Sequence, residues 1–411
     1  MNTRPSTALI PSFDHQDVVF ASAFSVLREA IAERAFPAAS IAVTQQDRLV
    51  ALKSLGHFTY DADAPPFPNF EVTSSTLFDI ASVTKPIATT TMAAILHERG
   101  LLELDAPIVG TLPEFLADAC EEVDARRRNV TFRMLLDHSS GLPSYEKLFL
   151  KAHSRDELLF AAFSTSLSAD PGTRGEYSDI GFIILGAALE RIAQESLDLF
   201  CQREIFGPLA MTNTTFDPGK ELRSSIPATA DDRIFRKRII QGEVQDENAY
   251  VLGGVAGHAG LFSTAEDLAR FAHAMLQYQN CHFEEAEANT TVGRDTPSFS
   301  QAHNDANSRE AISKPILRPE TLALFTRREV LPPGTTRALG WDTPATPSQS
   351  GKYFGPRSYG HLGYTGTSLW IDPDRELSIT LLTNRTWPDC SNQAIKLVRP
   401  KFHDAVVEAL T

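Results

Sequence analysis

Cysteine is scarce in this chain, and the four that occur stand far apart at Cys120, Cys201, Cys281 and Cys390. None of them forms a C-x-x-C pair. Disulfide-rich scaffolds and cysteine zinc sites need cysteines in closely spaced sets, so the sequence indicates neither of them. We expect free, buried thiols.

Positive charge is also in short supply. Thirty-eight Lys and Arg stand against 52 Asp and Glu, which gives a formal net charge of −14. A surface with this excess of negative charge repels phosphate backbones and anionic lipids. We therefore expect neither a nucleic-acid partner nor a membrane partner.

Long hydrophobic runs are missing as well. No uninterrupted apolar run reaches about 18 residues, the length that a membrane span needs. The first 20 residues, MNTRPSTALIPSFDHQDVVF, also lack the apolar core of a secretory signal. We expect a cytoplasmic protein, or a periplasmic one if the start of the chain has been misassigned.

The order of periodic segments predicts the fold class. Strand-like stretches lie towards both ends of the chain, at 39–44, 49–55, 362–371 and 377–383. Helical periodicity is found at 19–35, 82–100, 181–194, 265–277, 318–326 and 392–410. This order predicts an α/β (α+β) fold in which both chain ends form one antiparallel sheet flanked by helices, with a mainly helical inserted domain.

The same pattern divides the chain into regions. We expect residues 17–75 and 312–411 to form a discontinuous sheet domain, and residues 76–278 to form the helical domain. Residues 279–311 are polar and have no apolar period. They are expected to form an irregular surface insertion that could be mobile.

One tetrad carries the chemistry of nucleophilic catalysis. Ser82-Val83-Thr84-Lys85 opens a predicted helix, where the three-residue spacing puts the hydroxyl and the amine on one face. A serine at a helix N-terminus also has backbone N–H groups beside it that favour an oxyanion. A second tetrad starts at Ser144, but it follows a Gly-Leu-Pro loop, and its serine is typical of a helix N-cap. The context therefore favours Ser82.

Further motifs follow Ser82 in a fixed order. They are LLDHSSGLP at 135–143, PGT at 171–173, YSD at 177–179, GPLAM at 207–211, GGVAGHAGLFSTAED at 253–267 and GHLGYTG at 360–366. With the tetrad they resemble the successive signatures of the class C β-lactamase family. That family includes penicillin-binding proteins, D-amino-acid-specific peptidases and esterases with a β-lactamase fold. The resemblance covers roughly residues 30–410.

The resemblance implies a role for each matching residue. Ser82 would be the nucleophile, and Lys85 and Tyr177 the pair that moves its proton. The strand motif from His361 to Gly363 would line the cleft. The backbone N–H groups of Ser82 and Tyr364 would form the oxyanion hole. A serine hydroxyl needs such a neighbouring base, because it is a poor nucleophile at neutral pH.

The second motif departs from the family pattern at Asp179, where the family often has Asn. A carboxylate beside Lys85 should raise the lysine pKa and keep the amine cationic. We therefore prefer Tyr177, made more acidic by Lys85, as the general base.

The third motif departs at two positions. His361 stands where many β-lactamases have Lys, and Leu362 where they have Thr. An imidazole is mostly neutral at pH 7 and leucine offers no donor, so both changes weaken the binding of a carboxylate. This favours uncharged esters or amides. The candidate substrate-binding residues are Asp179, His361, Leu362 and Gly363.

Two other histidines receive structural interpretations. His138 is expected to fix a loop by hydrogen bonding. His258 lies in a glycine-rich segment that lacks the spacing of a phosphate loop, so a tight turn beneath the cleft is expected instead. The chain has no H-E-x-x-H zinc motif and no G-x-S-x-G elbow.

These observations predict a serine hydrolase that needs no metal and no cofactor and that forms an acyl-enzyme on Ser82. Its substrates would be small esters first, D-amino-acid amides second and β-lactams third. The alternative is a penicillin-binding or sensor module that is acylated but does not turn over. The natural substrate and the oligomeric state stay open.

Overall fold

The two ends of the chain build one sheet in the computed structural model, which describes residues 9–61, 68–116, 124–291 and 315–411. Its six strands lie in the order β1-β3-β2-β11-β10-β9. They are β1 (Ile10–Pro11), β2 (Ala38–Gln45), β3 (Arg48–Gly56), β9 (Tyr359–Leu362), β10 (Ser368–Asp372) and β11 (Leu377–Thr383). Strand β11 pairs antiparallel with β2 from Leu377↔Gln45 to Thr383↔Ala39, which joins the two chain ends. The expected sheet is confirmed.

One strand pair departs from the antiparallel prediction. Strand β1 pairs in parallel with β3, with Ile10 opposite Arg48. This strand also lies before residue 17, where the sequence placed the start of the sheet domain. Two residues are too few to show a period, so no sequence pattern indicates this strand.

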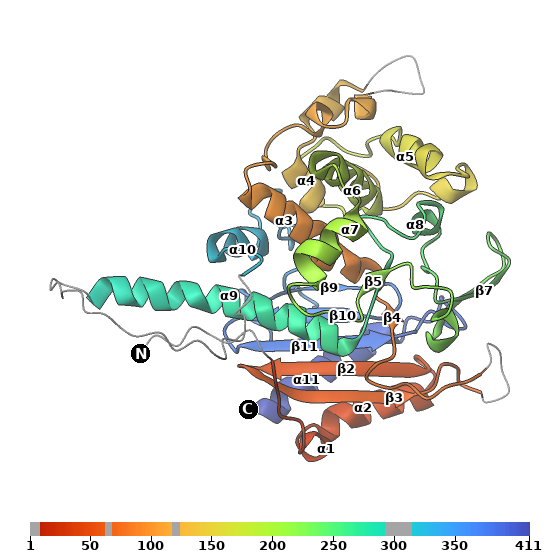
Figure 1. Cartoon of the computed structure of the whole chain (residues 1–411), viewed down its shortest axis with the longest axis vertical. Helices are drawn as coiled ribbons and strands as arrows, with labels where there is room; N and C mark the ends of the chain where they lie inside the picture. The colour runs from red at the N-terminus through yellow and green to blue at the C-terminus, as the bar shows by residue number, and fades with distance from the viewer. Residues whose placement is uncertain (1–8, 62–67, 117–123, 292–314) are drawn as a thin grey trace, which may run out of the picture.

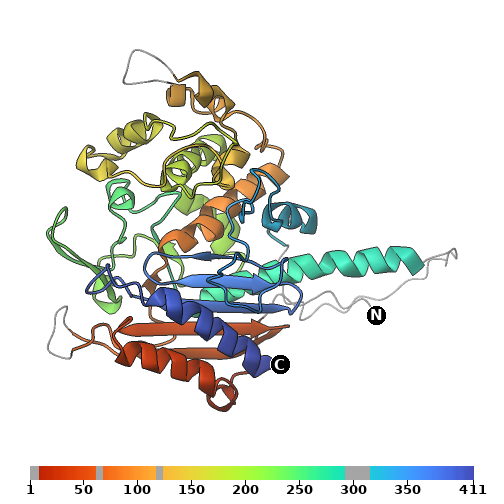
Figure 2. The same cartoon turned by 180° about the vertical axis from the view of Figure 1, so that it is seen from behind.

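Both faces of the sheet are covered. Along β2, Ile41 and Val43 belong to a core shared with the helices α2 and α11, whereas Ala38 and Ala42 belong to the larger core on the helical side. This alternation follows from the two-residue period of a strand. The helices on the first face are α1 (Gln16–Val19), α2 (Ala21–Ala32) and α11 (Ile395–Leu410). Figures 1 and 2 show the sheet in the lower half of the molecule and most of the other helices above it.

The middle of the chain is mainly helical, as predicted. Its helices are α3 (Thr91–Glu98), α4 (Phe132–Leu136), α5 (Arg155–Phe163), α6 (Asp179–Ala193), α7 (Leu197–Cys201), α8 (Glu247–Val251) and α9 (Ala265–Thr291), and α10 (Pro319–Thr326) follows. Strands β4 (Phe78–Asp79), β8 (Leu261–Ser263) and β5 (Thr215–Phe216) form a small second sheet, and β6 (Ala228–Asp232) pairs with β7 (Arg238–Gln241). Helix α6 is buried along most of its length and lies at the centre of this region.

Helix α9 corrects the prediction for the polar insertion. It was expected to end at 277 but runs to Thr291, so residues 279–291 are helical rather than irregular. A polar stretch without apolar period offers no pattern by which a helix can be recognised. Residues 292–311 of the predicted insertion lie outside the described residues. Helix α9 packs on β2 and β11 and in Figure 1 extends beyond the sheet. The division into domains stays a prediction.

The cysteines agree with the expectation only in part. Cys201 is free and buried, whereas Cys390 is free and exposed. Cys120 and the side chain of Cys281 lie outside what the structure describes.

Candidate active site

Ser82 lies on an irregular helix start that follows strand β4. Residues Ala81–Val83 form a 3-10 turn and Lys85–Thr90 a wider π-type turn, after which the regular helix α3 begins. Pro86 has no N–H to donate and is accommodated within this opening. The helical segment ends at Gly100, whose φ of +69° suits glycine. The predicted extent from 82 to 100 is confirmed, although its first turns are not regular.

The structure brings three predicted residues together. The amine of Lys85 lies 3.0 Å from the Ser82 hydroxyl and 2.6 Å from the hydroxyl of Tyr177. The two hydroxyls are themselves 2.7 Å apart. Tyr177 is separated from Ser82 by 95 positions along the chain. Only the fold places its phenol on the Ser82 hydroxyl.

Two further oxygens complete the surroundings of Lys85. The Oδ1 atom of Asp179 lies 2.6 Å from the amine and also accepts a hydrogen bond of 3.1 Å from Tyr177. The backbone carbonyl of His258 accepts another of 3.0 Å. The lysine side chain is fully buried, so these contacts replace its water.

Burial changes the acidity of both proton-handling groups. It lowers the pKa of the Lys85 amine below the usual lysine value, and the charge of Asp179 opposes this shift. It raises the pKa of Tyr177 well above 10, and here Asp179 adds to the effect. The expectations of a raised Lys85 pKa and a more acidic Tyr177 are therefore wrong. Loss of water outweighs the pairwise charges on which those expectations rested.

The segment that carries Tyr177 and Asp179 is held in place through Ser178, which lies between them. The Ser178 side chain accepts a hydrogen bond of 3.0 Å from the Gly181 N–H and caps helix α6. The Nδ1 atom of His138 accepts from the Ser178 N–H at 3.0 Å, and its ring lies 4.7 Å from that of Tyr177. Burial lowers the pKa of His138 well below 6.5, which keeps this ring neutral. The predicted loop-fixing role of His138 is confirmed.

The turn between β9 and β10 carries Gly363 and Tyr364. Arg399 donates to the Gly363 carbonyl at 2.8 Å, and Arg385 donates to the Tyr364 carbonyl at 2.6 Å. The Tyr364 N–H donates to no other described residue. It is thus available for the oxyanion-hole role that the resemblance implies.

Gly363 has a steric reason to be glycine. A Cβ atom at this position would meet the side chain of Thr367 and would lie 2.5 Å from the Ile80 carbonyl oxygen. The β9–β10 turn and the Ser82 turn therefore approach each other more closely than any larger residue permits.

The structure separates the other two residues of the third motif. Leu362 lines the cleft beside Gly363 and Tyr364. The His361 side chain is only 2% exposed, lies behind Tyr177 at a ring distance of 6.2 Å and is not among the residues that line the cleft. Burial lowers its pKa well below 6.5, so the ring is neutral as predicted. The predicted contact between His361 and substrate gains no support from this placement.

A cleft of about 820 Å³ opens over Ser82. Tyr177, Asp179 and the β9–β10 turn form part of its lining. The other walls were not predicted from the sequence. They come from the β6–β7 hairpin, residues 245–247, the loop from 145 to 150 and the start of α11. No short-range signal links these segments to Ser82, because they reach it only through the fold.

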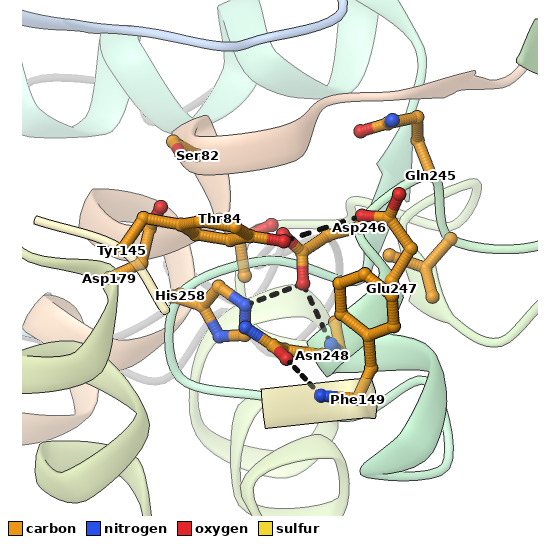
Figure 3. A network of polar contacts seen from close by, with 12 residues as sticks. Ser82, Thr84, Tyr145, Phe149, Asp179, Gln245, Asp246, Glu247, Asn248 and His258 are labelled. Carbon is orange, nitrogen blue, oxygen red and sulfur yellow. Dashed lines mark hydrogen bonds and ion pairs between the residues drawn. The ribbon is translucent and has the colours of Figure 1, made fainter. Parts of the chain in front are cut away.

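A polar network lies below Ser82 (Figure 3). Asp246 accepts hydrogen bonds of 2.8 Å from the His258 ring and 2.7 Å from the Ala249 N–H. Tyr145 lies beside Glu247, and burial raises its pKa, an effect to which the charges of Asp246, Glu247 and Asp179 add. This wall of the cleft is therefore negative.

The glycine-rich segment forms the predicted turn beneath the cleft. At Gly257, a Cβ atom would collide with the Phe182 carbonyl and would lie 3.0 Å from the Cα atom of Gly186, so this segment needs glycine to pack on α6. The following carbonyl, that of His258, is the one that Lys85 contacts.

The second tetrad is arranged differently from the first. Ser144 is exposed and opens no helix, because the next helical turn is Leu148–Leu150. The predicted cap role of Ser144 is therefore wrong. Its backbone carbonyl instead accepts a hydrogen bond of 2.9 Å from the Asp179 N–H.

The described residues contain no group of three or more His, Cys, Asp or Glu side chains placed to hold a metal ion. Within the same ranges, no helix is both long and apolar enough to cross a membrane.

The chain is similar to several known proteins. The chain is 29% identical over 374 residues to an N-acetylmuramyl-L-alanine amidase of Bacillus subtilis, covering 85% of this chain and 77% of the relative. It is 28% identical over 377 residues to a putative D-alanyl-D-alanine carboxypeptidase of Escherichia coli, covering 85% and 79%.

A solved structure shares the fold. EstCE1, described as a hydrolase with promiscuous acyltransferase activity, superimposes with a TM-score of 0.68 at 20% identity, covering 95% of this chain and 99% of EstCE1. The sequence model of the family described as Beta-lactamase matches residues 24–398. The chain therefore belongs to the β-lactamase family of serine hydrolases.

Proposed function

We propose that this enzyme hydrolyses small, uncharged esters or amides through an acyl-enzyme on Ser82. The observation that carries the proposal is the contact of the Ser82 hydroxyl with both the Lys85 amine, at 3.0 Å, and the Tyr177 hydroxyl, at 2.7 Å, beside an open cleft. These distances allow a proton to leave Ser82 for either group without any movement of the backbone.

Lys85 is the better base of the two. Because burial lowers its pKa, a larger fraction of the amine is neutral and able to accept a proton than in water. Tyr177 stays protonated, so it acts as a relay that accepts the Ser82 proton while donating its own to Lys85 at 2.6 Å. The ammonium that results is stabilised by Asp179.

The acyl transfer then proceeds in two steps. The Ser82 oxygen bonds to the substrate carbonyl carbon, and the N–H groups of Ser82 and Tyr364 stabilise the oxyanion. The bond to the alcohol or amine breaks, and the leaving group takes up the proton held by the Lys85 and Tyr177 pair. Water next attacks the ester on Ser82, gives its proton to the same pair and releases the acid.

The electrostatics of the cleft favour uncharged substrates. Asp179, Asp246 and Glu247 make one wall negative. On the other wall, Arg385 and Arg399 donate their hydrogen bonds to backbone carbonyls of the protein. A substrate carboxylate near Ser82 therefore meets repulsion from the wall of Asp179, Asp246 and Glu247 and finds the donors of Arg385 and Arg399 occupied, so we place esters and amides before β-lactams. Lys147 and Lys396 also line the cleft.

The test compares two chromogenic substrates. Purified wild-type protein and the Ser82→Ala variant are given p-nitrophenyl butyrate and a chromogenic cephalosporin side by side. We expect steady ester turnover by the wild type, slower cephalosporin turnover, and a loss of at least about 1,000-fold in Ser82→Ala, as expected when a nucleophile is removed. Ser144→Ala is the matched control, because it removes the serine of the second tetrad, and it should keep wild-type rates.

Three outcomes would contradict the proposal. Equal ester turnover by the wild type and Ser82→Ala would remove Ser82 from its role, and preference for the cephalosporin would reverse the order of substrates. A single burst of product equal to the enzyme concentration, with no turnover after it, would favour the penicillin-binding or sensor alternative.

A further inference from the structure

The backbone just before Ser82 adopts a costly conformation. Ala81 has a φ of +48°, in the left-handed region that residues with a Cβ atom avoid. Such a conformation persists only where surrounding contacts hold it. Ala81 directly precedes Ser82, so its φ sets where the Ser82 hydroxyl and N–H point.

A buried carboxylate makes the contacts that hold this turn. Asp79 is 2% exposed, and its Oδ1 atom accepts a hydrogen bond of 2.8 Å from the Ala81 N–H. Its Oδ2 atom accepts another of 2.7 Å from the Gln245 N–H, which lies 166 positions further along the chain. Gln245 precedes Asp246, the partner of the His258 ring. Both oxygens of Asp79 are therefore engaged, one by the nucleophile's own turn and one by the floor of the cleft.

The backbone of the same segment contacts the β9–β10 turn. The Thr365 hydroxyl donates to the Asp79 carbonyl at 2.7 Å, and the Thr367 hydroxyl donates to the Ile80 carbonyl at 2.9 Å. Thr365 directly follows Tyr364, whose N–H is the second proposed oxyanion donor. The two donors of the oxyanion hole thus lie on turns that are bonded to each other through residues 79 and 80.

We propose that Asp79 is a positioning residue that holds Ala81 at positive φ and thereby aims Ser82 at the oxyanion hole. This inference rests on the proposed function of Ser82. Asp79 touches no reacting atom, so its loss should affect the rate of chemistry more than the binding of substrate. Displacements of about 1 Å at a reacting group can cost about 100-fold in rate.

The first test is the isosteric variant Asp79→Asn. An amide offers only one acceptor oxygen, so one of the two backbone N–H groups would face an NH2 group. We expect kcat for p-nitrophenyl butyrate to fall by about 10- to 100-fold while KM stays within about threefold. Rates are taken per mole of folded protein, measured by circular dichroism at the assay temperature.

Asp267→Asn is the matched control. Asp267 is also 2% exposed, and it accepts hydrogen bonds from the Asn213 N–H at 2.7 Å and the Thr214 hydroxyl at 3.0 Å. Burial raises its pKa, as it raises that of Asp79 to about 6. Asp267 contacts neither Ser82 nor its turn, so its variant should lose stability but keep kcat within about threefold.

A rescue experiment separates positioning from general stability. Glycine adopts positive φ without the cost that alanine bears, so Ala81→Gly lowers the dependence of the turn on Asp79. We expect kcat of the double variant Asp79→Asn with Ala81→Gly to be at least about threefold higher than kcat of Asp79→Asn alone. If Asp79→Asn does not fold, Thr365→Val decides instead, with an expected fall in kcat of about threefold or more.

Several results would overturn the inference. One is a folded Asp79→Asn variant with wild-type kcat, and another is an equal loss of kcat in Asp267→Asn. A third is a double variant whose kcat glycine at position 81 does not restore. Where Thr365→Val decides, wild-type kcat in that variant would overturn the inference. These results leave the proposed function intact as long as Ser82→Ala is inactive. An active Ser82→Ala would instead remove the proposed function itself.

Discussion

The carboxylate at position 179 forms an ion pair with a fully buried lysine. The Asp179 carboxylate lies 2.6 Å from the Lys85 amine, and its charge raises the lysine pKa while burial lowers it. The family often has a neutral Asn at this position, which would remove the largest effect that opposes burial. The two residues thus set how much of the amine is neutral at a given pH, and a single substitution can test this balance.

Asp179→Asn should move the pH–rate profile towards acid. Removing the carboxylate lowers the Lys85 pKa further, so the neutral amine becomes available at lower pH. We expect the limb on which kcat/KM rises with pH to shift down by about 1 to 3 pH units, the usual effect of an opposite charge at this distance. The measurement is kcat/KM for p-nitrophenyl butyrate between pH 5 and pH 9, because this ratio reports the free enzyme.

Asp374→Asn is the control for this experiment. Asp374 forms an ion pair of 2.8 Å with Arg357, and neither residue lines the cleft. Its variant should leave the limb in place. An unmoved or upward-shifted limb in Asp179→Asn would show that the ionisation of Lys85 does not govern the rate.

At the scale of elements, the β6–β7 hairpin gives one wall of the cleft its character. Four of its charged residues form two ion pairs, Asp231 with Arg233 at 2.6 Å and Asp232 with Arg236 at 2.8 Å. Ile234, at the tip, is 78% exposed and has no charge to satisfy. The tip of the hairpin therefore offers substrate an exposed apolar side chain next to charges that are already paired.

Ile234→Ser should weaken the binding of longer acyl chains. Partial burial of this side chain by a substrate is worth about 1 kcal/mol at about 25 cal/mol per Å² of apolar area, or roughly a fivefold change in affinity. We expect KM for p-nitrophenyl hexanoate to rise by about that factor, with kcat and the KM for p-nitrophenyl acetate little changed. Steady-state kinetics on the two esters measure the difference.

Val18→Ser is the matched control for the hairpin. Val18 is 81% exposed in α1 and does not line the cleft. Its variant should bind both esters as the wild type does. Parallel rises in KM for acetate and hexanoate in Ile234→Ser would argue against an apolar acyl site at the hairpin.

At the scale of the whole molecule, buried histidines make the folded state sensitive to acid. Burial lowers the pKa of His403 to about 3 and that of His138 and His361 well below 6.5. The unfolded chain binds these protons more readily, so this stability is present above about pH 6.5 and is lost as pH falls. Asp79 and Asp137, whose pKa burial raises to about 6, act in the opposite direction. The pKa values of Asp267 and Glu247 are raised by burial in the same way. The carboxylates whose pKa is lowered in the folded state, Asp232 and Asp246 among them, act with the histidines, so stability should fall towards acid.

His403→Gln should reduce this loss. His403 is fully buried in α11, and its Nε2 atom lies 3.3 Å from the Ser368 hydroxyl, a contact that an amide can make without titrating. Between pH 6.5 and pH 5, one such histidine accounts for about 2 kcal/mol of the fall in the free energy of unfolding. Urea denaturation at the two pH values measures this fall in the free energy of unfolding, which should be smaller in the variant by about that amount.

The exposed His153 provides the comparison. His153→Gln should show the same loss of stability between the two pH values as the wild type. An equal loss in His403→Gln and the wild type would mean that His403 does not resist protonation in the folded state.

Local patterns in the sequence determined much of the architecture and the core of the candidate site. The three-residue spacing of Ser82 and Lys85 and the two-residue period of β2 are properties of short segments, so they can be read without the fold. The order of motifs also identified Tyr177 and Asp179, which the structure places against Lys85. The polar half of α9 was missed because a helix without an apolar face leaves no period to detect.

The tertiary structure alone decided which groups lose their water and which distant segments support Ser82. Burial reversed the acidity expected for Lys85 and Tyr177, and it placed His361 behind the cleft wall rather than in it. Asp79 meets Gln245 across 166 positions of chain. Solvation and contacts between distant segments depend on how the whole chain packs, and no local pattern of residues encodes them.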